Sequence, residues 1–228
     1  IDWPYSCRVG SCGTCRCKLG SGKIKPLNDF SYVLSDEELD QGYILACQTM
    51  LQGDIEVELP LNGSAVQLAK ARRIAGKIAG IKQLTHDIQE IEIELEKEFK
   101  DYLPGQYAEI MVPGVIEQAR SYSFSKSPVF EEGNQVSFFI RHVPNGTFTD
   151  WLHSGNRMGE RVVLHGPHGT FYLREPEGAI LMVAGGSGLA PIRALMQQIA
   201  DKALECDVTL IFGARTQKDL YCLDEINE

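Results

Sequence analysis

Four cysteines within the first fifty residues restrict what this chain can fold around. Three of them follow the spacing C-x4-C-x2-C in the segment YSCRVGSCGTCRCKL, and a fourth stands alone in LACQT. They are Cys7, Cys12, Cys15 and Cys47. This spacing is typical of plant-type [2Fe–2S] clusters, in which one loop supplies three thiolates and a distant residue supplies the fourth. We therefore expect the N-terminal part of the chain to fold around these four sulfur ligands.

The loop that carries three thiolates must bend back on itself, and its glycines allow this. Gly10 and Gly13 are predicted to take positive φ and to let amide N–H groups point at the inorganic sulfurs of the cluster. Cys17 follows Cys15 by two positions but does not fit the four-ligand pattern. We expect Cys17 to be a small buried residue.

Two other uses of cysteine fit less well. A disulfide framework favours an even number of cysteines in a short secreted chain, whereas this chain has seven in 228 residues. A zinc site usually offers two C-x2-C pairs, and only one is present here.

Composition and charge exclude several classes of protein. The net charge is −9 and the pI is about 5.1, so nucleic acid is not an expected partner. No apolar run approaches the ~18–20 residues of a membrane span, and the sequence shows no signal peptide. Because a thiol-rich loop suits a reducing compartment, we expect a cytoplasmic protein without membrane insertion. The chain begins at Ile1 rather than Met and ends within a predicted helix, so we expect a fragment.

The chain divides by its periodicity into four segments. Residues 1–62 are expected to form the cluster domain, with a capping box from Ser35 to Glu38 and a half-buried strand over 54–60. Residues 63–72 are expected to form a linker. Repeated strand signals over 73–175 predict a small antiparallel β-barrel. Strand, glycine-rich turn, helix and second buried strand over 176–228 predict half of a doubly wound parallel sheet.

Within the barrel segment, two expectations concern individual side chains. The strand over 87–95 should present one apolar face, after one irregularity in its pattern. That face would comprise Ile88, Ile91, Ile93 and Leu95. A short helix around Trp151 should be capped by Thr147 or Thr149.

Three stretches could bind nucleotides, and each has a simpler explanation. In RSYSFS, Arg120 and Tyr122 share one strand face, which suits a pyrophosphate and a flat ring but is also typical of an edge strand. The helix start at Gly146 could bind phosphate or be an ordinary cap. In GGSGLAP, Gly186 and Gly188 match a dinucleotide-binding turn, with Pro191 replacing its last glycine in the first helical turn.

These motifs, in the order cluster loop, RSYSFS, GGSGLAP and FGARTQKDLYCLDEI, resemble the NADH-dependent reductase components of multicomponent hydrocarbon oxygenases. That family joins a plant-type ferredoxin domain to a ferredoxin–NADP reductase-like module. The resemblance implies a multidomain fold: a partial β-grasp [2Fe–2S] domain, an antiparallel β-barrel FAD domain and an incomplete α/β doubly wound NAD domain. It also implies that both outer domains are truncated.

The resemblance assigns residues to three cofactors. The four cysteines named above would hold the cluster. FAD would be bound by Arg120 at its pyrophosphate, Tyr122 against its ring system and Ser123 near N5, with Ser121, Val143, Gly146, Thr147 and Thr149 close by. The nicotinamide nucleotide would contact Gly186, Ser187, Gly188, Pro191 and Arg215.

The resemblance further implies that electrons pass from NADH through FAD and the cluster to a terminal oxygenase, directly or through a ferredoxin. This oxygenase could be a membrane-bound protein. Because the cofactors carry the chemistry, no catalytic side chain is expected. Two alternatives stay open: the same electron chain serving a deoxysugar dehydratase or a similar partner, and a non-catalytic ferredoxin-type carrier.

The choice between NADH and NADPH depends on the segment after the second strand of the nucleotide domain. Arg215 and Lys218 would favour the 2′-phosphate of NADPH, whereas Asp219 would oppose it. The resemblance favours NADH, with Asp219 expected to cap a helix beginning at that residue.

Overall fold

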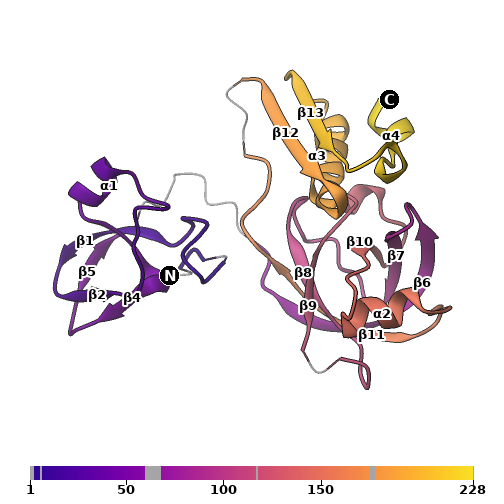
Figure 1. Cartoon of the computed structure of the whole chain (residues 1–228), viewed down its shortest axis with the longest axis horizontal. Coiled ribbons are helices and arrows are strands. Elements are labelled where there is room, and N and C mark those ends of the chain that lie inside the picture. Colours follow the sequence, from indigo (N-terminus) through magenta and orange to yellow (C-terminus); the bar gives the residue numbers. More distant parts are fainter. Residues whose placement is uncertain (1–2, 6, 60–67, 117, 175–177, 228) are drawn as a thin grey trace. The chain divides into compact units, whose positions relative to one another are not determined.

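In the computed structural model the chain forms two units, Ile1–Gln67 (unit 1) and Leu68–Glu228 (unit 2). The structure describes residues 3–5, 7–59, 68–116, 118–174 and 178–227, and Figure 1 traces the whole chain. Residues 63–67 of the predicted linker 63–72 lie outside the described residues. Its last residue, Arg72, was wrongly placed in the linker, because it begins the first strand of unit 2.

The described residues of unit 1 form two small antiparallel sheets and one short α-helix. One sheet has the order β3-β1-β5, and the other pairs β2 with β4. The strands are β1 (Arg16–Ser21), β2 (Ile24–Pro26), β3 (Tyr43–Leu45), β4 (Thr49–Leu51) and β5 (Glu56–Glu58). Val57 is half-buried between exposed Glu56 and Glu58, which confirms the predicted alternation there.

The helix α1 (Asp36–Asp40) leads the chain back to β3. Its start confirms the predicted capping box: Ser35 Oγ accepts from the Glu38 N–H, and the Glu38 carboxylate accepts from the Ser35 N–H. Cys17, on β1, is fully buried against the core residues of this unit, which confirms its predicted burial.

Unit 2 begins with the predicted barrel. Six antiparallel strands follow the order β10-β7-β6-β11-β8-β9, and a bridge between Phe124 and Phe138 brings the two ends of the sheet together. The strands are β6 (Arg72–Gln83), β7 (Ile88–Leu95), β8 (Tyr107–Met111), β9 (Arg120–Ser123), β10 (Gln135–Arg141) and β11 (Arg161–His168). The helix α2 (Thr147–His153) packs Phe148 and Leu152 into the barrel core.

The expected single apolar face of β7 is wrong. β7 pairs with β10 without a register shift from Ile88 to Glu94, so side chains alternate strictly between the two faces. Ile91, Ile93 and Leu95 enter the barrel core, whereas Ile88 lies on the other face and belongs to the second core of unit 2. The irregularity that was predicted between Ile88 and Ile91 is therefore only the step from one face of the strand to the other.

The second core lies under the strand–helix–strand segment. The strands β12 (Ile180–Gly185) and β13 (Val208–Gly213) are parallel, and α3 (Leu189–Asp201) connects them (Figure 1). The helix buries Leu189, Ile192 and Leu195 there. The prediction of fully buried strands is wrong for one face of each, because Leu181, Val183 and Ile211 are exposed.

A buried ion pair joins the barrel to α3. Arg193 on α3 donates to the Glu90 carboxylate of β7 at 2.8 Å, and both residues are buried. Arg193 also donates to Glu225 of α4 (Leu223–Asn227) at 2.7 Å. Glu90 occupies the same face of β7 as Ile88, so that face meets the helix through one apolar and one charged side chain.

Two predicted helix caps are wrong. α2 begins after Gly146 and has no side-chain cap, because Thr147 and Thr149 both lie inside the helix. Asp219 begins no helix either. It closes the 3-10 turn Gln217–Asp219, and its carboxylate accepts from the N–H and hydroxyl of Thr216. In the described residues no helix is long and apolar enough to cross a membrane.

One carboxyl group in unit 2 makes stability depend on pH. Burial raises the pKa of Glu131 to about 7, although the Ser137 hydroxyl donates to it at 2.9 Å. The folded chain therefore keeps this proton as pH rises, whereas an unfolded glutamate loses it near its ordinary value of 4.5. Ionisation of Glu131 should lower the free energy of unfolding between about pH 4.5 and 7.

Replacing Glu131 with glutamine removes this titration. We expect the advantage of Glu131→Gln over the unchanged protein to grow by about 2 kcal/mol between pH 5.5 and pH 8. Urea unfolding at both pH values measures it, with exposed Glu132→Gln as the matched control. An advantage independent of pH would contradict the assignment.

Candidate functional site

Strand pairing brings the distant cysteine to the cysteine loop. The loop ends at Cys15, immediately before β1, and Cys47 lies in the 3-10 turn Ala46–Gln48 after β3. Because Arg16 pairs with Leu45, the residues just beyond this pair are also neighbours. The Ala46 N–H donates to the Cys15 carbonyl at 3.3 Å, and the Cys47 N–H donates to Cys15 Sγ at 3.5 Å.

Backbone N–H groups point at the sulfurs of two of the four cysteines. Besides the bond to Cys15, the Ser11 N–H donates to Cys7 Sγ at 3.3 Å. Hydrogen bonding from Ser11 lowers the pKa of Cys7 to about 6, which favours the thiolate that ligates metal. Burial raises the pKa of Cys15 to about 11, and the neighbouring thiols of Cys47 and Cys12 add to this effect.

Both loop glycines have the predicted positive φ, +78° for Gly10 and +69° for Gly13. Gly10 also meets a spatial requirement, because a Cβ there would lie 2.7 Å from Gln48 Cγ. The Gln48 side-chain amide donates to the Arg8 carbonyl at 3.1 Å. The loop is therefore held against the turn that carries Cys47.

The donor set fits a binuclear cluster better than the alternatives. All seven cysteines lie in the described residues and are free thiols, so no disulfide framework is present. A tetrathiolate zinc site, with ~2.3 Å bonds, would bring its sulfurs within about 4 Å of one another. In the described parts of the chain no three cysteine sulfurs lie mutually within 4.8 Å. The wider arrangement suits ligands divided between two irons.

The predicted flavin strand is β9, at one edge of the barrel sheet. Its pairing with β8 sets Arg120 opposite Ile110 and Tyr122 opposite Ala108, so Arg120 and Tyr122 share one face, as predicted. Ser121 and Ser123 lie on the other face, opposite Glu109 and Tyr107. Arg120 is exposed, and its guanidinium donates to the Gln118 and Ala119 carbonyls at 3.2 and 3.3 Å.

Tyr122 connects this strand to α2. Its ring lies 5.6 Å from that of Phe148, and burial raises the pKa of its hydroxyl to about 12. A half-buried aromatic ring beside an exposed guanidinium is a suitable surface for a flat ring joined to a pyrophosphate. The strand and the helix together therefore offer the chemistry that FAD requires.

The turn before α2 is closely packed. A Cβ on Gly146 would lie 2.6 Å from Thr149 Oγ1, so glycine is required there. The buried Thr149 hydroxyl donates to the Val143 carbonyl and accepts from its N–H, at 3.0 and 3.1 Å. Thr149 therefore shapes the turn, whereas Val143 and Thr147 are exposed on it.

A cavity of about 300 Å³ lies where β12 and β13 end. Its lining comprises Asp87, Ile88, Arg141, Gly186, Gly213, Ala214, Arg215 and Asp219. Ligands of open α/β sheets bind outside the carboxyl ends of the parallel strands, which is where this cavity lies. The structure thus brings together two predicted residues, Gly186 and Arg215. Ser187, Gly188 and Pro191 follow in the chain but do not line the cavity.

Sequence reasoning missed two residues of this cavity, Asp87 and Arg141. Arg141 ends β10 and donates to Asp87 at 2.9 Å, and Arg215 donates to the same carboxylate at 3.2 Å. Burial would raise the pKa of Asp87, but hydrogen bonds from Thr85 and Arg141 hold it below its usual value. The sequence signal that could have identified this site is Arg141, a charged residue at the end of a predicted barrel strand.

Comparison with known families assigns each part of the chain. The family described as "2Fe-2S iron-sulfur cluster binding domain" matches residues 1–52. "Oxidoreductase FAD-binding domain" matches residues 75–172, and "Oxidoreductase NAD-binding domain" matches residues 182–228. The three matches therefore agree in order with the cysteine loop, the barrel and the parallel strands.

Several proteins are similar to this chain over nearly its whole length. The chain is 42% identical to the xylene/toluene monooxygenase electron transfer component XylA of Pseudomonas putida, over 99% of this chain and 63% of that protein. It is 34% identical to the 2-halobenzoate 1,2-dioxygenase electron transfer component of Burkholderia cepacia, over 100% of this chain and 67% of that protein. The crystal structure of the Amycolatopsis cytochrome P450 reductase GcoB is similar with a TM-score of 0.72 and 30% identity, over 98% of this chain and 67% of that one.

The chain thus spans about two thirds of the length of these relatives. Its sequence is similar to theirs throughout, and its folded parts follow in the same order. The chain belongs to the family of electron transfer components of oxygenase systems, oxidoreductases that join a 2Fe-2S domain to FAD-binding and NAD-binding domains.

Proposed function

We propose that the whole protein transfers electrons from NADH through FAD and a [2Fe–2S] cluster to a terminal oxygenase, directly or through a ferredoxin. The chain's relatives are named as electron transfer components of monooxygenase and dioxygenase systems, which supports an oxygenase as the acceptor. When bound, FAD accepts a hydride equivalent and gives up single electrons, which an iron–sulfur cluster can carry.

The observation that carries this proposal is the composition of the cavity in unit 2. Asp87, Ile88 and Arg141 come from the barrel, whereas Gly186, Gly213 and Arg215 come from the parallel strands. A nucleotide bound at the ends of β12 and β13 would therefore also meet the barrel. A separate carrier domain would have no need of a cavity built in this way.

The residues of the chain bind and orient, and none is required as an acid, a base or a nucleophile. Arg120 would bind the pyrophosphate of FAD and Tyr122 would pack against its ring system. Gly186, with a φ of +52°, lets the backbone approach the nicotinamide nucleotide, and its carbonyl is held by the Tyr221 hydroxyl at 2.8 Å. Cys7, Cys12, Cys15 and Cys47 would ligate the cluster.

The charges around Arg215 support NADH as the electron donor. Its guanidinium lies 3.2 Å from Asp87 and 3.9 Å from Asp219. Arg141 also contacts Asp87, so two arginines are balanced there by the carboxylates of Asp87 and Asp219. The cavity therefore offers little net positive charge to a 2′-phosphate and suits the free ribose hydroxyls of NADH.

Ferricyanide reduction by the protein loaded with FAD and cluster tests the function. We expect a higher specificity constant with NADH than with NADPH, and a visible spectrum that contains both flavin and iron–sulfur absorbance. A preference for NADPH would overturn the choice of donor. Absence of bound flavin would support the non-catalytic carrier instead.

Flavin retention after gel filtration tests Arg120. Loss of its charge-assisted contact should cost about 1.5–3 kcal/mol, so Arg120→Ala should bind FAD more than tenfold more weakly while keeping its cluster absorbance. Arg161→Ala, which removes an exposed arginine from β11, is the matched control. Equal flavin retention by both variants would disprove the assignment of Arg120.

A further inference from the structure

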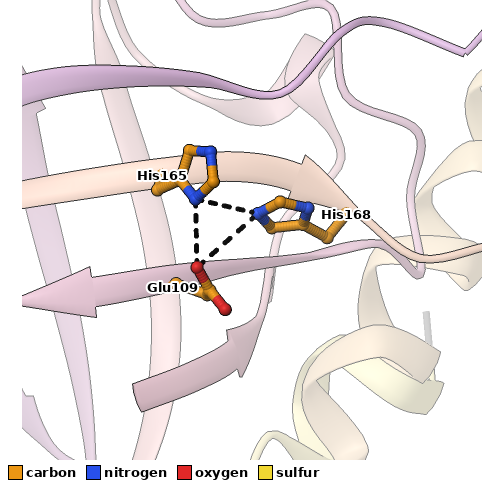
Figure 2. A group of neighbouring side chains, drawn as sticks. All are labelled: Glu109, His165 and His168. Carbon is orange, nitrogen blue, oxygen red and sulfur yellow. Dashed lines mark hydrogen bonds and ion pairs between the residues drawn. The ribbon is translucent and has the colours of Figure 1, made fainter. Parts of the chain in front are cut away.

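Three side chains of types that can ligate a metal ion converge on the outer face of the barrel sheet. Glu109 comes from β8, and His165 and His168 come from β11 (Figure 2). Their neighbours Ile110 and Leu164 point into the barrel core, so these three side chains lie on the face opposite the core. The flavin strand β9 and the cavity of unit 2 do not include them.

A bulge in β11 puts the two histidines on the same face. Residues three apart on a regular strand point to opposite faces. Here His165 pairs with Glu109 and His168 pairs with Tyr107, so three steps along β11 match two along β8. The extra residue restores His168 to the face of His165. Gly166 allows the close pairing, because a Cβ there would lie 3.0 Å from the Cβ of Ala108.

The three ligand atoms have the spacing of a tetrahedral zinc site. His165 Nδ1 lies 3.0 Å from Glu109 Oε2 and 3.3 Å from His168 Nε2, and His168 Nε2 lies 3.9 Å from Glu109 Oε2. Bonds of ~2.0–2.1 Å in tetrahedral geometry place ligand atoms about 3.3 Å apart. Octahedral neighbours would lie about 3.0 Å apart at the same bond length, so the observed set fits four-coordination better.

His165 Nδ1 lies beside both the Glu109 carboxylate oxygen and His168 Nε2, at 3.0 and 3.3 Å. In one tautomer, a proton on His165 Nδ1 points between the carboxylate and the lone pair of a neutral His168 Nε2. A metal ion in place of that proton would receive a lone pair from each of the three atoms.

We propose that Glu109, His165 and His168 bind a divalent transition metal ion of the zinc class. Two imidazoles and one carboxylate suit such an ion, whereas Mg²⁺ and Ca²⁺ prefer oxygen ligands alone. The side chains are 34% exposed for His165, 19% for His168 and 40% for Glu109. This exposure admits the ion and leaves room for water as the fourth ligand. The site joins two neighbouring strands of the FAD-binding barrel.

A second group of similar composition lacks these properties. His86, Asp87 and Asp219 also place ligand atoms close together. However, Arg141 and Arg215 already donate to Asp87, at 2.9 and 3.2 Å, and two guanidinium groups beside the carboxylate oppose a further cation. His86 therefore supplies the matched control for the experiment.

The experiment titrates Zn²⁺ into protein whose cluster is fully loaded, so that iron occupies the thiol ligands. Two irons per chain, measured before titration, verify this loading. Competition with a chromophoric chelator should show one zinc ion bound per chain. We expect the affinity for zinc to fall at least tenfold in His165→Ala and in His168→Ala, and to stay unchanged in His86→Ala. Mg²⁺ should not compete with zinc.

Glu109→Gln is a second variant that should not disturb folding, because glutamine has the same size as glutamate and the side chain is partly exposed. It too should weaken zinc binding at least tenfold, with the flavin content unchanged. Equal zinc affinity in the unchanged protein and in these three variants would overturn the proposal. Loss of zinc binding in His86→Ala, with binding kept in the other variants, would overturn the proposal as well.

Discussion

Cys15→Ser should abolish cluster assembly, reducing the iron content from about two atoms per chain to none after reconstitution. Cys15 is buried, and its sulfur accepts from the Cys47 N–H. A serine hydroxyl in this position would not be deprotonated at neutral pH and is a poor iron ligand. Cys7→Ser, Cys12→Ser and Cys47→Ser should have the same effect. Iron analysis and visible absorbance measure it.

Cys17 provides the matched control, because it is buried in the same core and only two residues away. Cys17→Ala should retain both irons and the visible spectrum. Alanine is preferable to serine here, because it introduces no hydroxyl group into an apolar core. Retention of iron by Cys15→Ser together with its loss in Cys17→Ala would reverse the ligand assignment.

Arg193→Met should lower the free energy of unfolding of unit 2 by about 3–5 kcal/mol. The substitution leaves the Glu90 carboxylate buried without its cation, 2.8 Å from the position that the guanidinium occupied. Most of the loss comes from this unpaired charge. Adding Glu90→Gln to Arg193→Met should therefore recover a large part of the stability, because the buried charge is then gone.

Urea unfolding of the three proteins, followed by circular dichroism, measures these effects. Glu225→Gln is the control, because Glu225 bonds the same arginine from a side chain that is 44% exposed. An exposed ion pair contributes at most about 1 kcal/mol, so this variant should remain close to the unchanged protein. Equal destabilisation by the single and the double substitution would exclude the explanation by an unpaired charge.

Local spacing predicted the parts of the site that lie close together in sequence. The cysteine loop, its two glycines and the Arg120–Tyr122 face all depend on intervals of a few residues, which backbone geometry converts directly into positions. The fold class followed from strand and helix periodicity in the same way. The positive φ of Gly10 and Gly13 shows how closely such local requirements are met.

The sequence-based predictions failed where a residue's position depends on pairing between strands that are distant in sequence. Ile88 was grouped with Ile91 because both are apolar, but they belong to different cores. Asp87 and Arg141 were missed because the cavity that they line combines barrel strands with strands far along the chain. His165 and His168 were overlooked because strand alternation separates residues three apart, and only the bulge in β11 reverses this. Pairing between distant strands decides all three cases.

The four candidate cluster ligands of unit 1 differ in burial. Cys12 is exposed and Cys15 is buried, so a cluster held by them would have one edge at the surface and the other in the core. Electron tunnelling weakens steeply with the distance between donor and acceptor. In the proposed function, an electron acceptor would therefore approach the Cys12 side, where Val9 is 67% exposed, because the core behind Cys15 would lengthen any other route.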